Sequence, residues 1–499
     1  MLFVRNFPFF SIFLPIVCAI VCLPLRGRAA KWVTLACMSA LIAMSAAVFV
    51  HTARSGKSFV YMMGHFPAPF GNELRCGPTE SFMALLFCCV SLFSVSGGLG
   101  DLPADVPAGK TNYFFIMHNM LIGAMLAMVY TNDLFTAYVF IEIITLSACS
   151  IVSAKKGGRT LAASLNYLIM SVAGSCLLLL SIAILYSVTG HLLMPNLRLS
   201  VAALFATGQY TMPLFVLSGL MTVGLSIKSA LFPFHSWLPD AHASATTSAS
   251  SVLSGLIIKC YLMLLIKLEY RVFGLETMEL LRIPYILLAF GAAGIVYGSW
   301  KAIRQKDIKR MLSYSSITQV GYISVAMSLN TSDGMAAACF HIAVHAIGKA
   351  MLFTAVGGLT EASGRRNDYS SLLGAARRAP LSGAAFILGG LTMAGIPPFP
   401  GFASKLYLTL AALETPFAVP VVIVVVIAGT ILGFMFYFPA VVCILSKGEE
   451  HSNMMGKAPI AASLSRRTAL VAFISLTLFL GLFSPHLLSI ITRGLAVFA

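Results

Sequence analysis

The chain has 499 residues, of which 59% are hydrophobic and only 10% are charged. This composition excludes an ordinary soluble domain, in which about a quarter of the residues are charged. The formal charge of +16 is compatible with nucleic acid or acidic lipid as a partner. Most lysines and arginines, however, lie in short segments between apolar runs, as in membrane proteins with positively charged loops. We therefore expect a lipid bilayer around the chain and no nucleic-acid partner.

Apolar runs of about 20 residues, the length that crosses a bilayer, recur along the whole sequence. We predict an all-α polytopic membrane protein with about 14 transmembrane helices. The first run follows Arg5 and has no small-residue cleavage signal, so we expect a retained helix rather than a signal peptide. The predicted spans are 7–25, 33–53, 80–99, 113–131, 134–154, 161–188, 211–241, 248–268, 283–303, 308–329, 335–359, 380–411, 418–446 and 468–491.

The charge of the loops predicts the orientation of these spans. Basic residues concentrate in every second loop, including the segments Arg365–Arg378 and Lys447–Arg467. Such loops usually face the cytoplasm. An even number of spans then leaves both termini outside, and we expect a multi-pass protein of the cell inner (plasma) membrane.

The 11 cysteines lie mostly inside apolar runs, and no pair has the CxxC spacing of a metal or redox site. They predict small buried residues rather than disulfides. The sequence has no haem, flavin or nucleotide motif either. We therefore expect no cofactor and no metal ion in this chain.

Two of the predicted spans are interrupted by prolines close to a lysine. In the seventh span Lys228 precedes Pro233, and in the twelfth span Pro397 and Pro398 precede Lys405. Proline breaks a helix because it lacks an N–H group and clashes with the preceding turn. A broken helix survives in a membrane only where protein or a wet cavity surrounds it. Neither lysine is therefore expected to face lipid.

Paired interruptions at matching positions of two halves are typical of inverted repeats around a transport path. The two breaks lie five spans apart, and because five is odd, two such repeats in series have opposite topology. We predict two inverted five-helix repeats, each containing a broken helix. The chain then divides into an N-terminal three-helix segment at 1–110, a first repeat at 111–272 with its break near 229–239, a second repeat at 282–446 with its break near 395–401, and a C-terminal helix at 467–499.

Further ionisable groups lie deep inside apolar spans, where a charge is costly and usually functional. Glu142 lies midway along the fifth span, and Lys259 lies inside the eighth. His341, His345 and Lys349 recur every four residues in the eleventh span, so one helix face carries all three. A structural buried acid, snorkelling lysines and a satisfied core histidine are the ordinary explanations. Three groups on one face favour a proton relay, whereas a lysine without an acid on that face argues against a metal site.

Such groups can move protons for a physical reason. Burial lowers the pKa of a lysine, and a nearby glutamate raises it again. A change in the contact between the two therefore changes the proton affinity of the lysine. Histidine titrates near neutral pH and can pass protons between donors and acceptors.

Several motifs resemble the antiporter-like membrane proteins shared by respiratory complex I, the Mrp cation/proton antiporters (their D type) and the membrane-bound group 4 hydrogenases. The segment 306–322, KDIKRMLSYSSITQVGY, is the most specific match. The resemblance covers nearly the whole chain and includes the segments 132–142, 228–259, 341–353 and 401–405. The sequence departs from the family at Ala245-Thr246-Thr247, where a proline is usual, and at Lys259-Cys260-Tyr261, which lacks a glycine. Both departures concern how the eighth helix starts and packs.

The resemblance implies a proton conduit, with sodium as the alternative ion, coupled to redox chemistry or antiport in partner subunits. The expected partners are other membrane subunits, including similar antiporter-like ones. Whether the assembly is an oxidoreductase or an antiporter stays open. In the family, Glu142 and Lys228 would form a switchable pair, Lys259, His341, His345 and Lys349 would carry protons along the middle of the membrane, and Lys405 would connect to the far exit.

Two other functions are compatible with the sequence. A stand-alone secondary transporter for a solute would need a pocket of selective polar groups, whereas the deep polar residues here follow one another in a line. A non-conducting scaffold subunit would have no need of the complete set of buried lysines.

Overall fold

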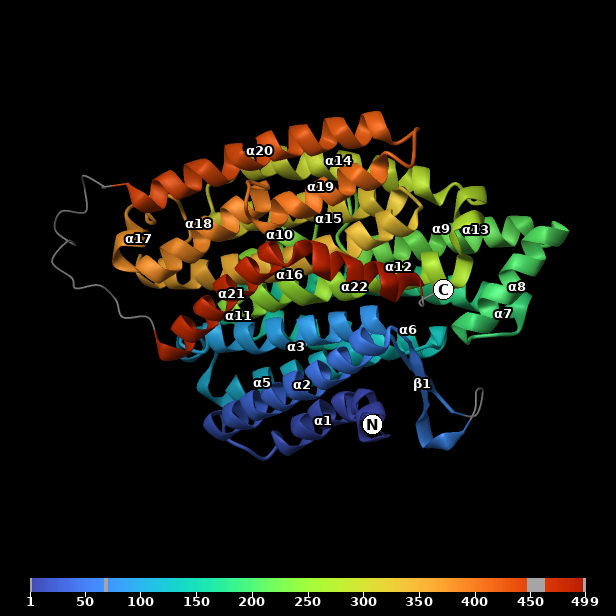
Figure 1. Ribbon diagram of the computed structural model, residues 1–499. Helices are drawn as coiled ribbons and strands as arrows, with labels where there is room; N and C mark the ends of the chain where they lie inside the picture. Colours follow the sequence, from blue (N-terminus) through green and yellow to red (C-terminus); the bar gives the residue numbers. More distant parts are fainter. Residues whose placement is uncertain (1, 67–70, 447–462, 497–499) are drawn as a thin grey trace.

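The computed structural model describes residues 2–66, 71–446 and 463–496 of the chain. Long helices run side by side through the molecule, and a small hairpin projects at one end (Figure 1). Twelve helices among the described residues are long and apolar enough to cross a membrane. They are η1 with α1 (Leu2–Asn6, Phe7–Val21), α2 (Gly27–Ser55), α3 (Pro78–Gly98), α5 (Thr111–Tyr130), α6 (Leu134–Ser153), α7 (Gly158–Thr189), α9 (Thr211–Lys228), the continuous α11, η4, α12 and η5 (Thr247–Val252, Leu253–Ile257, Ile258–Lys267, Leu268–Phe273), α14 (Ile283–Ile303), α16 (Ser332–Glu361), α20 (Val419–Leu445) and α21 (Leu464–Leu482).

Shorter elements connect or complete these helices. The hairpin pairs two antiparallel strands, with Phe59 opposite Cys76. The shorter elements are β1 (Phe59–Met62), η2 (Met63–His65), β2 (Glu73–Cys76), α4 (Leu102–Asp105), η3 (Ala108–Lys110), α8 (Met194–Thr207), α10 (Leu238–Ser244), α13 (Leu275–Leu280), α17 (Ala375–Arg378), α18 (Pro380–Ala394), α19 (Pro400–Ala412) and α22 (Ser484–Ala496). Helix α15 (Ile308–Ser328) is as long as α14 but less apolar than the twelve.

Every predicted span overlaps a helix of the structure, so the all-α polytopic fold is confirmed. Both predicted breaks are present, because α9 ends at Lys228 before α10, and α18 ends at Ala394 before α19. The predicted span 468–491 is instead two helices, α21 and α22, and Pro485 is the second residue of α22. Proline is tolerated in the first turn of a helix but not in its interior. The count of fourteen and the inverted repeats stay predictions.

The centre of the bundle is formed by the continuous segment 247–273 and by α16, which are buried along their apolar windows. Helices α7 and α20 lie at the periphery and expose large apolar side chains such as Leu165 and Val424. The central helices pack closely on their neighbours where small residues meet. A Cβ atom on Gly321 of α15 would lie 2.6 Å from the carbonyl oxygen of Gly291 in α14, so glycine allows these two backbones to touch.

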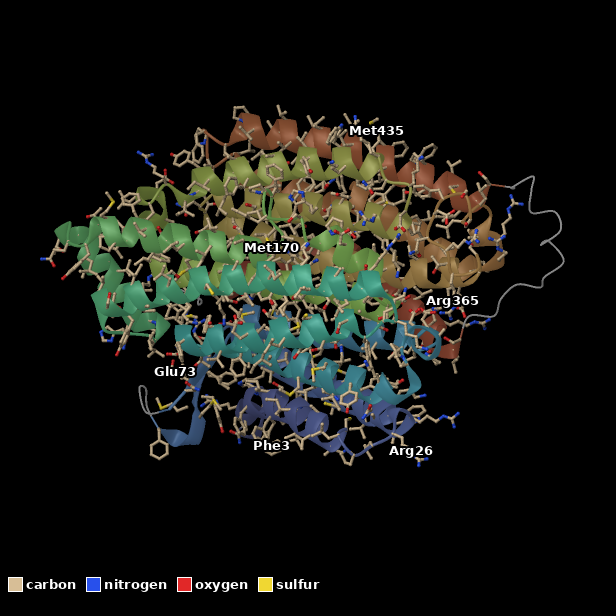
Figure 2. The ribbon with its side chains drawn as sticks, turned by 180° about the vertical axis from the view of Figure 1, so that it is seen from behind. Phe3, Arg26, Glu73, Met170, Arg365 and Met435 are labelled. Carbon is tan, nitrogen blue, oxygen red and sulfur yellow. The ribbon has the colours of Figure 1, made fainter. Side chains whose placement is uncertain are left out.

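The two ends of the bundle differ in charge. Arg26 and Arg365 lie at one end and Glu73 lies at the other (Figure 2). Both termini lie at the same end (Figure 1), as an even number of spans requires. The orientation of this bundle in the membrane stays a prediction, and Lys447 and Lys457 of the predicted basic loops lie outside the described residues.

Two of the basic residues that the sequence places in loops are buried in the structure. Arg466 is 1% exposed in the first turn of α21, where it pairs with Asp101 at 2.7 Å and with Glu361. Lys309 is 4% exposed and donates to the carbonyl of Ala245 at 3.1 Å. Two carboxylates compensate the charge of Arg466, and Lys309 is enclosed by the protein, so both contribute less to the loop charge than the sequence suggests.

Candidate functional site

Glu142 and Lys228 are brought together by α6 and the end of α9. The Lys228 ammonium lies 3.7 Å from the Glu142 carboxylate and donates to the hydroxyl of Thr145 at 2.9 Å. Ser175 of α7 also donates to Glu142. The Lys228 side chain is fully buried, whereas that of Glu142 is 30% exposed. The structure thus places the predicted pair in contact, with the carboxylate toward the edge of the bundle and the lysine inside it.

The break after Lys228 is stabilised by the tryptophan that follows it. The last carbonyls of a helix lack intrahelical partners, and Trp237 Nε1 donates to one of them, the Ile227 carbonyl, at 3.0 Å. Trp237 is fully buried and its ring lies against Tyr167 of α7. These contacts hold the end of α9, and Lys228 with it, in the interior.

A hydroxyl pair connects Lys228 with the helix that carries Lys259. The Tyr261 hydroxyl lies 3.3 Å from Thr145 Oγ1, and the Lys228 ammonium lies 5.4 Å from the Tyr261 ring centroid. Lys259, two residues before Tyr261, donates to the Ser254 carbonyl and lies 3.5 Å from Nε2 of His345 in α16. The central helices therefore place Lys259 between the first break and the histidines.

His341 has a partner on each ring nitrogen. Gln319 donates from its amide nitrogen to the Met393 carbonyl at 3.2 Å, which turns its amide oxygen toward His341 Nε2 at 3.0 Å. Ser404 lies 2.9 Å from His341 Nδ1 and 3.0 Å from the carbonyl of Gly401. Nε2 therefore carries a hydrogen atom, and the charge of the ring depends on Nδ1.

The single hydroxyl hydrogen of Ser404 can satisfy both charge states of His341. When the ring is neutral, the hydroxyl donates to Nδ1. When the ring is protonated, Nδ1 donates to Ser404 and the hydroxyl turns to the Gly401 carbonyl. His341 and Ser404 therefore keep a hydrogen bond in both states. This matters because a buried polar group that lacks a hydrogen bond destabilises the fold.

Lys405 follows Ser404 in α19 and is 5% exposed. It donates to the Ala394 carbonyl at 2.8 Å and to Thr430 Oγ1 of α20 at 3.0 Å, and it lies 4.8 Å from the Tyr322 ring centroid. Among the described residues no carboxylate comes within 4 Å of it. Gly395, with φ +84°, makes room for the lysine, because a Cβ atom there would lie 2.8 Å from Lys405 Cδ.

Lys349 shares the helix face of His341 and His345 but points to other partners. Its ammonium donates to the Leu312 carbonyl and to Ser315 Oγ, each at 2.8 Å, and to the hydroxyl of Tyr437 at 3.4 Å. The structure therefore places Lys349 on a branch toward α15 and α20, whereas the other six predicted residues lie along the line from Glu142 to Lys405.

The comparisons with known proteins show the family and the fold of the chain. Residues 131–432 match the family described as NADH:quinone oxidoreductase/Mrp antiporter, transmembrane region. The chain belongs to this family. It is 31% identical to NADH-quinone oxidoreductase subunit N of Desulforudis audaxviator over 87% of this chain and 84% of that protein. Its fold is similar to a chain of the archaeal membrane-bound sulfane sulfur reductase (TM-score 0.85, 25% identity, 99% and 96% of the two chains) and to one of the Mrp complex from Dietzia sp. (TM-score 0.86, 22% identity, 99% and 97%).

In this antiporter-like membrane protein, burial and hydrogen bonding reveal residues that sequence reasoning missed. His242 of α10 is fully buried and stacks on Phe353 with 4.5 Å between ring centroids. Neither of its ring nitrogens has a hydrogen-bond partner among the described residues. Lys349, Lys309 and Lys259 are the charged groups near enough to act on the ring electrostatically. The signal in the sequence was a histidine directly after the first break.

Lys267 is a second buried group that was missed. It is fully buried eight residues after Lys259 and donates to the carbonyls of Met128, Val129 and Thr131. These carbonyls lie at the C-terminal end of α5, where a helix favours a positive charge. Lys267 therefore fastens two central helices together, and its contacts do not join it to the line from Glu142 to Lys405.

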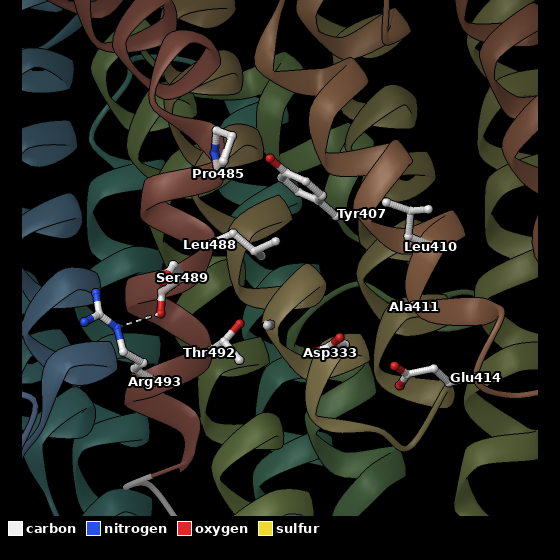
Figure 3. Close-up of a pocket in the computed structure, with 11 residues that line it drawn as sticks. Asp333, Tyr407, Leu410, Ala411, Glu414, Pro485, Leu488, Ser489, Thr492 and Arg493 are labelled. Atoms are coloured by element: carbon white, nitrogen blue, oxygen red, sulfur yellow. Dashed lines mark hydrogen bonds between the residues drawn. The ribbon is translucent and has the colours of Figure 1, made fainter.

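A cleft of about 560 Å³ opens at the end of the bundle that holds both termini. Tyr407 of α19 lies across from Leu488 and Thr492 of α22, and Asp333 and Glu414 lie on one side (Figure 3). The Tyr407 hydroxyl also lies 3.2 Å from Ser484 Oγ. Tyr407 is two residues past Lys405 in α19, so the two side chains lie on different faces of the helix, and the cleft lies beside the helix that follows the second break.

Proposed function

We propose that this chain is a proton-translocating, antiporter-like subunit of a multisubunit membrane assembly. The observation that carries the proposal is the set of close pairs among the predicted residues: Glu142 lies 3.7 Å from Lys228, Lys259 lies 3.5 Å from His345, and His341 lies 2.9 Å from Ser404, the residue before Lys405. The relatives include a subunit of NADH-quinone oxidoreductase and a chain of a Mrp complex, which supports assembly with other membrane subunits. Sodium is the alternative ion, and the plasma membrane is the proposed location.

The first step of the proposed relay is a change in the contact between Glu142 and Lys228. A carboxylate about 4 Å from an ammonium offsets part of the free energy of burying the charge. When Glu142 moves away, Lys228 is left with the neutral Thr145 hydroxyl and gives up its proton more readily. Because Glu142 is part-exposed and Lys228 is not, the carboxylate is the member of the pair with room to move.

The middle of the relay runs from Lys259 to Lys405 through the two histidines. Lys259 can pass a proton to His345 across 3.5 Å. The ring centroids of His345 and His341 lie 6.3 Å apart, a separation that one bridging water molecule spans. The Ser404 hydroxyl, next to Lys405 in the sequence, then accepts a hydrogen bond from the protonated ring of His341. Lys349 and His242 form a branch from this line, and the cleft near Tyr407 is the proposed opening at the other end.

The proposed repeats agree with this route. The first repeat, 111–272, would hold Glu142, Lys228 and Lys259, and the second, 282–446, would hold the histidines, Lys349 and Lys405. A proton that passes from Lys259 to His345 therefore crosses from one repeat to the other. This crossing would join two half-paths that open on opposite sides of the membrane.

The test compares two fully buried histidines, of which only one lies in the proposed relay. His345→Gln removes the group that faces Lys259. His118, in contrast, lies outside the proposed relay, and its Nε2 is hydrogen-bonded to Ser91 Oγ at 2.8 Å. Loss of a positioned acid–base group typically slows proton transfer by about 100-fold or more. We expect this loss for His345→Gln and near wild-type transport for His118→Gln, measured with a pH-sensitive dye in inverted vesicles that contain the complete assembly. Equal transport by both variants would remove His345 from the mechanism.

A further inference from the structure

A second cavity, of about 620 Å³, lies among the N-terminal helices, away from the proposed relay. Its charged lining residues are Arg26, Arg28 and Lys31, at the start of α2. Its apolar wall includes Leu99 and Leu102, on either side of the turn after α3, and Phe115 of α5. The cavity is therefore cationic on one side and apolar on the other.

The ends of the helices place this cavity at the surface of the bilayer. Helix α2 begins at Gly27, α3 ends at Gly98 and α5 begins at Thr111, and all three are long and apolar enough to span. Trp32, next to Lys31, is 66% exposed, and the Lys31 ammonium lies 4.6 Å from its ring centroid. Exposed tryptophans are typical of the membrane interface. The basic side chains then lie at the level of the lipid headgroups, and the apolar wall extends toward the hydrocarbon region.

The three basic residues have no ion-pair partner in the part of the chain that the structure describes. Among the described residues no carboxylate comes within 4 Å of them. The two acids nearest in sequence to the apolar wall have other partners: Asp101 pairs with Arg466 at 2.7 Å, and Asp105 lies 3.8 Å from Lys155 and 3.7 Å from Arg365. The cavity thus keeps an excess of positive charge.

Two helix N-termini add to this charge. A Cβ atom on Gly27 would lie 3.0 Å from Thr111 Cβ, so the first turns of α2 and α5 are in close contact. The N-terminus of a helix carries a partial positive charge. The C-terminal end of α3, at Leu99, offsets part of this effect, so the three cations supply most of the positive charge, which favours an anion with several oxygen atoms.

We propose that this cavity binds one anionic phospholipid, with its phosphate group among Arg26, Arg28 and Lys31 and the start of an acyl chain against Leu99 and Pro103, the apolar lining residues with exposed surface. Free phosphate shares the headgroup chemistry but cannot use the apolar wall. Basic cavities between spans at the cytoplasmic surface recognise anionic headgroups on these physical grounds. Because Arg26 and Arg365 lie at the same end of the bundle (Figure 2), the lipid belongs to the leaflet that the loop charges predict to be cytoplasmic.

The experiment is native mass spectrometry of the full-length chain in detergent, titrated with dioleoyl-phosphatidylglycerol. We expect one lipid to bind at least about tenfold more tightly than dioleoyl-phosphatidylcholine. Each basic residue near an anionic surface is worth about fivefold in affinity. Arg26→Gln and Arg28→Gln singly should therefore weaken this binding about fivefold each, and the triple variant with Lys31→Gln should abolish the preference for the anionic lipid.

The matched control is a triple variant of Lys301, Arg304 and Lys306, each changed to Gln, which removes the same charge elsewhere. It should bind phosphatidylglycerol like the wild type. Two further titrations separate the sources of phosphate: dihexanoyl-phosphatidylglycerol, which we expect to bind more weakly because its chains are short, and inorganic phosphate, which we expect not to displace the lipid at millimolar concentration. Equal binding of the two dioleoyl lipids, unchanged binding by the Arg26 and Arg28 variants, or displacement by inorganic phosphate would each overturn the proposal.

Discussion

Each helix break lies close to a buried lysine, but Lys228 ends the helix before its break, Lys405 lies in the second turn of the helix after its break, and the two have different electrical surroundings. At the first break, Lys228 lies 3.7 Å from the carboxylate of Glu142. At the second, Lys405 donates to the Ala394 carbonyl and the Thr430 hydroxyl and lies over the Tyr322 ring, and among the described residues no carboxylate lies within 4 Å of it. A buried charge needs a counter-charge or several well-placed dipoles to offset its desolvation. The similarity of the two breaks therefore does not extend to their charges, and the two halves of the chain have different parts in the proposed relay.

The largest effect is expected from removal of either lysine. Lys228→Ala and Lys405→Ala should each abolish ion translocation while the assembly still forms, because the proposed route requires each ammonium group to accept and release a proton. The measurement is a pH-dye assay in vesicles, with co-purification of the partner subunits as the control for assembly. Wild-type transport by both variants would end the relay hypothesis, and transport by one alone would show that only the other break is in use.

A smaller effect is expected at Glu142, which exists at the first break only. Glu142→Gln keeps the size of the side chain and an oxygen that can accept from Ser175, but removes the negative charge. At an effective dielectric near 20, a pair about 4 Å apart interacts by roughly 4 kcal/mol. Desolvation and the partial exposure of Glu142 reduce this to about 1–3 kcal/mol, or roughly 5- to 100-fold in rate.

We therefore expect Glu142→Gln to slow translocation strongly at neutral pH and Glu142→Asp to retain part of it. Coupled transport against pH in inverted vesicles distinguishes the two variants. If Glu142→Gln transports like the wild type across the whole pH range, Glu142 is a packing residue. The difference in charge between the two breaks then has no functional meaning.

At the second break the corresponding test is Thr430, one of the two groups that bind Lys405. Thr430→Val keeps the shape and removes the hydroxyl, and a hydrogen bond to a charged group is worth about 1.5–3 kcal/mol. The Ala394 carbonyl remains, so we expect transport to fall by about 5- to 20-fold. Thr430→Ser should restore most of it. If Thr430→Val loses transport and Thr430→Ser does not restore it, the valine variant has a packing defect, and the hydroxyl has no role in binding the Lys405 ammonium.

The smallest effect is expected from a label that reports orientation. Arg366 is exposed in the loop between α16 and α17, so Arg366→Cys should leave transport unchanged and should react with an impermeant maleimide from the cytoplasmic side. Asp368, in the same loop, is unsuitable for the cysteine because its carboxylate organises the loop. Ser370 and Ser371 donate hydrogen bonds to this carboxylate, and these bonds lower its pKa to about 2. Labelling of Arg366→Cys only from outside would invert the proposed orientation of the protein, and with it the side of the membrane toward which each helix break opens.

The fold was readable from the sequence where the signal is local. Apolar length located the spans, and prolines located the breaks after Lys228 and before Lys405, because both effects act within one or two helical turns. Pro485 has the same local effect, but the apolar run around it hid the division between α21 and α22. The interior positions of Lys309 and Arg466 depend on Ala245, Asp101 and Glu361, which are distant in the sequence, so no local pattern could reveal them.

The site was predictable in its members but not in its connections. Helical spacing put His341, His345 and Lys349 on one face, and the structure keeps them there. Which of them joins the line depends on side chains of other helices, since Gln319 and Ser404 bind His341 whereas Ser315 and Tyr437 bind Lys349. Likewise, only the packing of α10 against its neighbours shows that the His242 ring stacks on Phe353 and that its nitrogens have no hydrogen-bond partner among the described residues.

The burial of α16 has a consequence for the way the protein is made. This helix has no lipid-facing side within its apolar window, and it contacts α18, α19, α21 and α22, all of which are synthesised after it. A lysine at the middle of an inserting helix costs about 2.5–3.5 kcal/mol, so α16 enters the bilayer before the groups that will enclose its Lys349 exist. We expect chains truncated after Glu361 to be degraded rapidly in pulse–chase labelling and chains truncated after Leu445 to persist longer. The polar residues that would carry ions in the finished protein thus also slow its maturation, because they hold the central helix in a vulnerable state until translation is nearly complete.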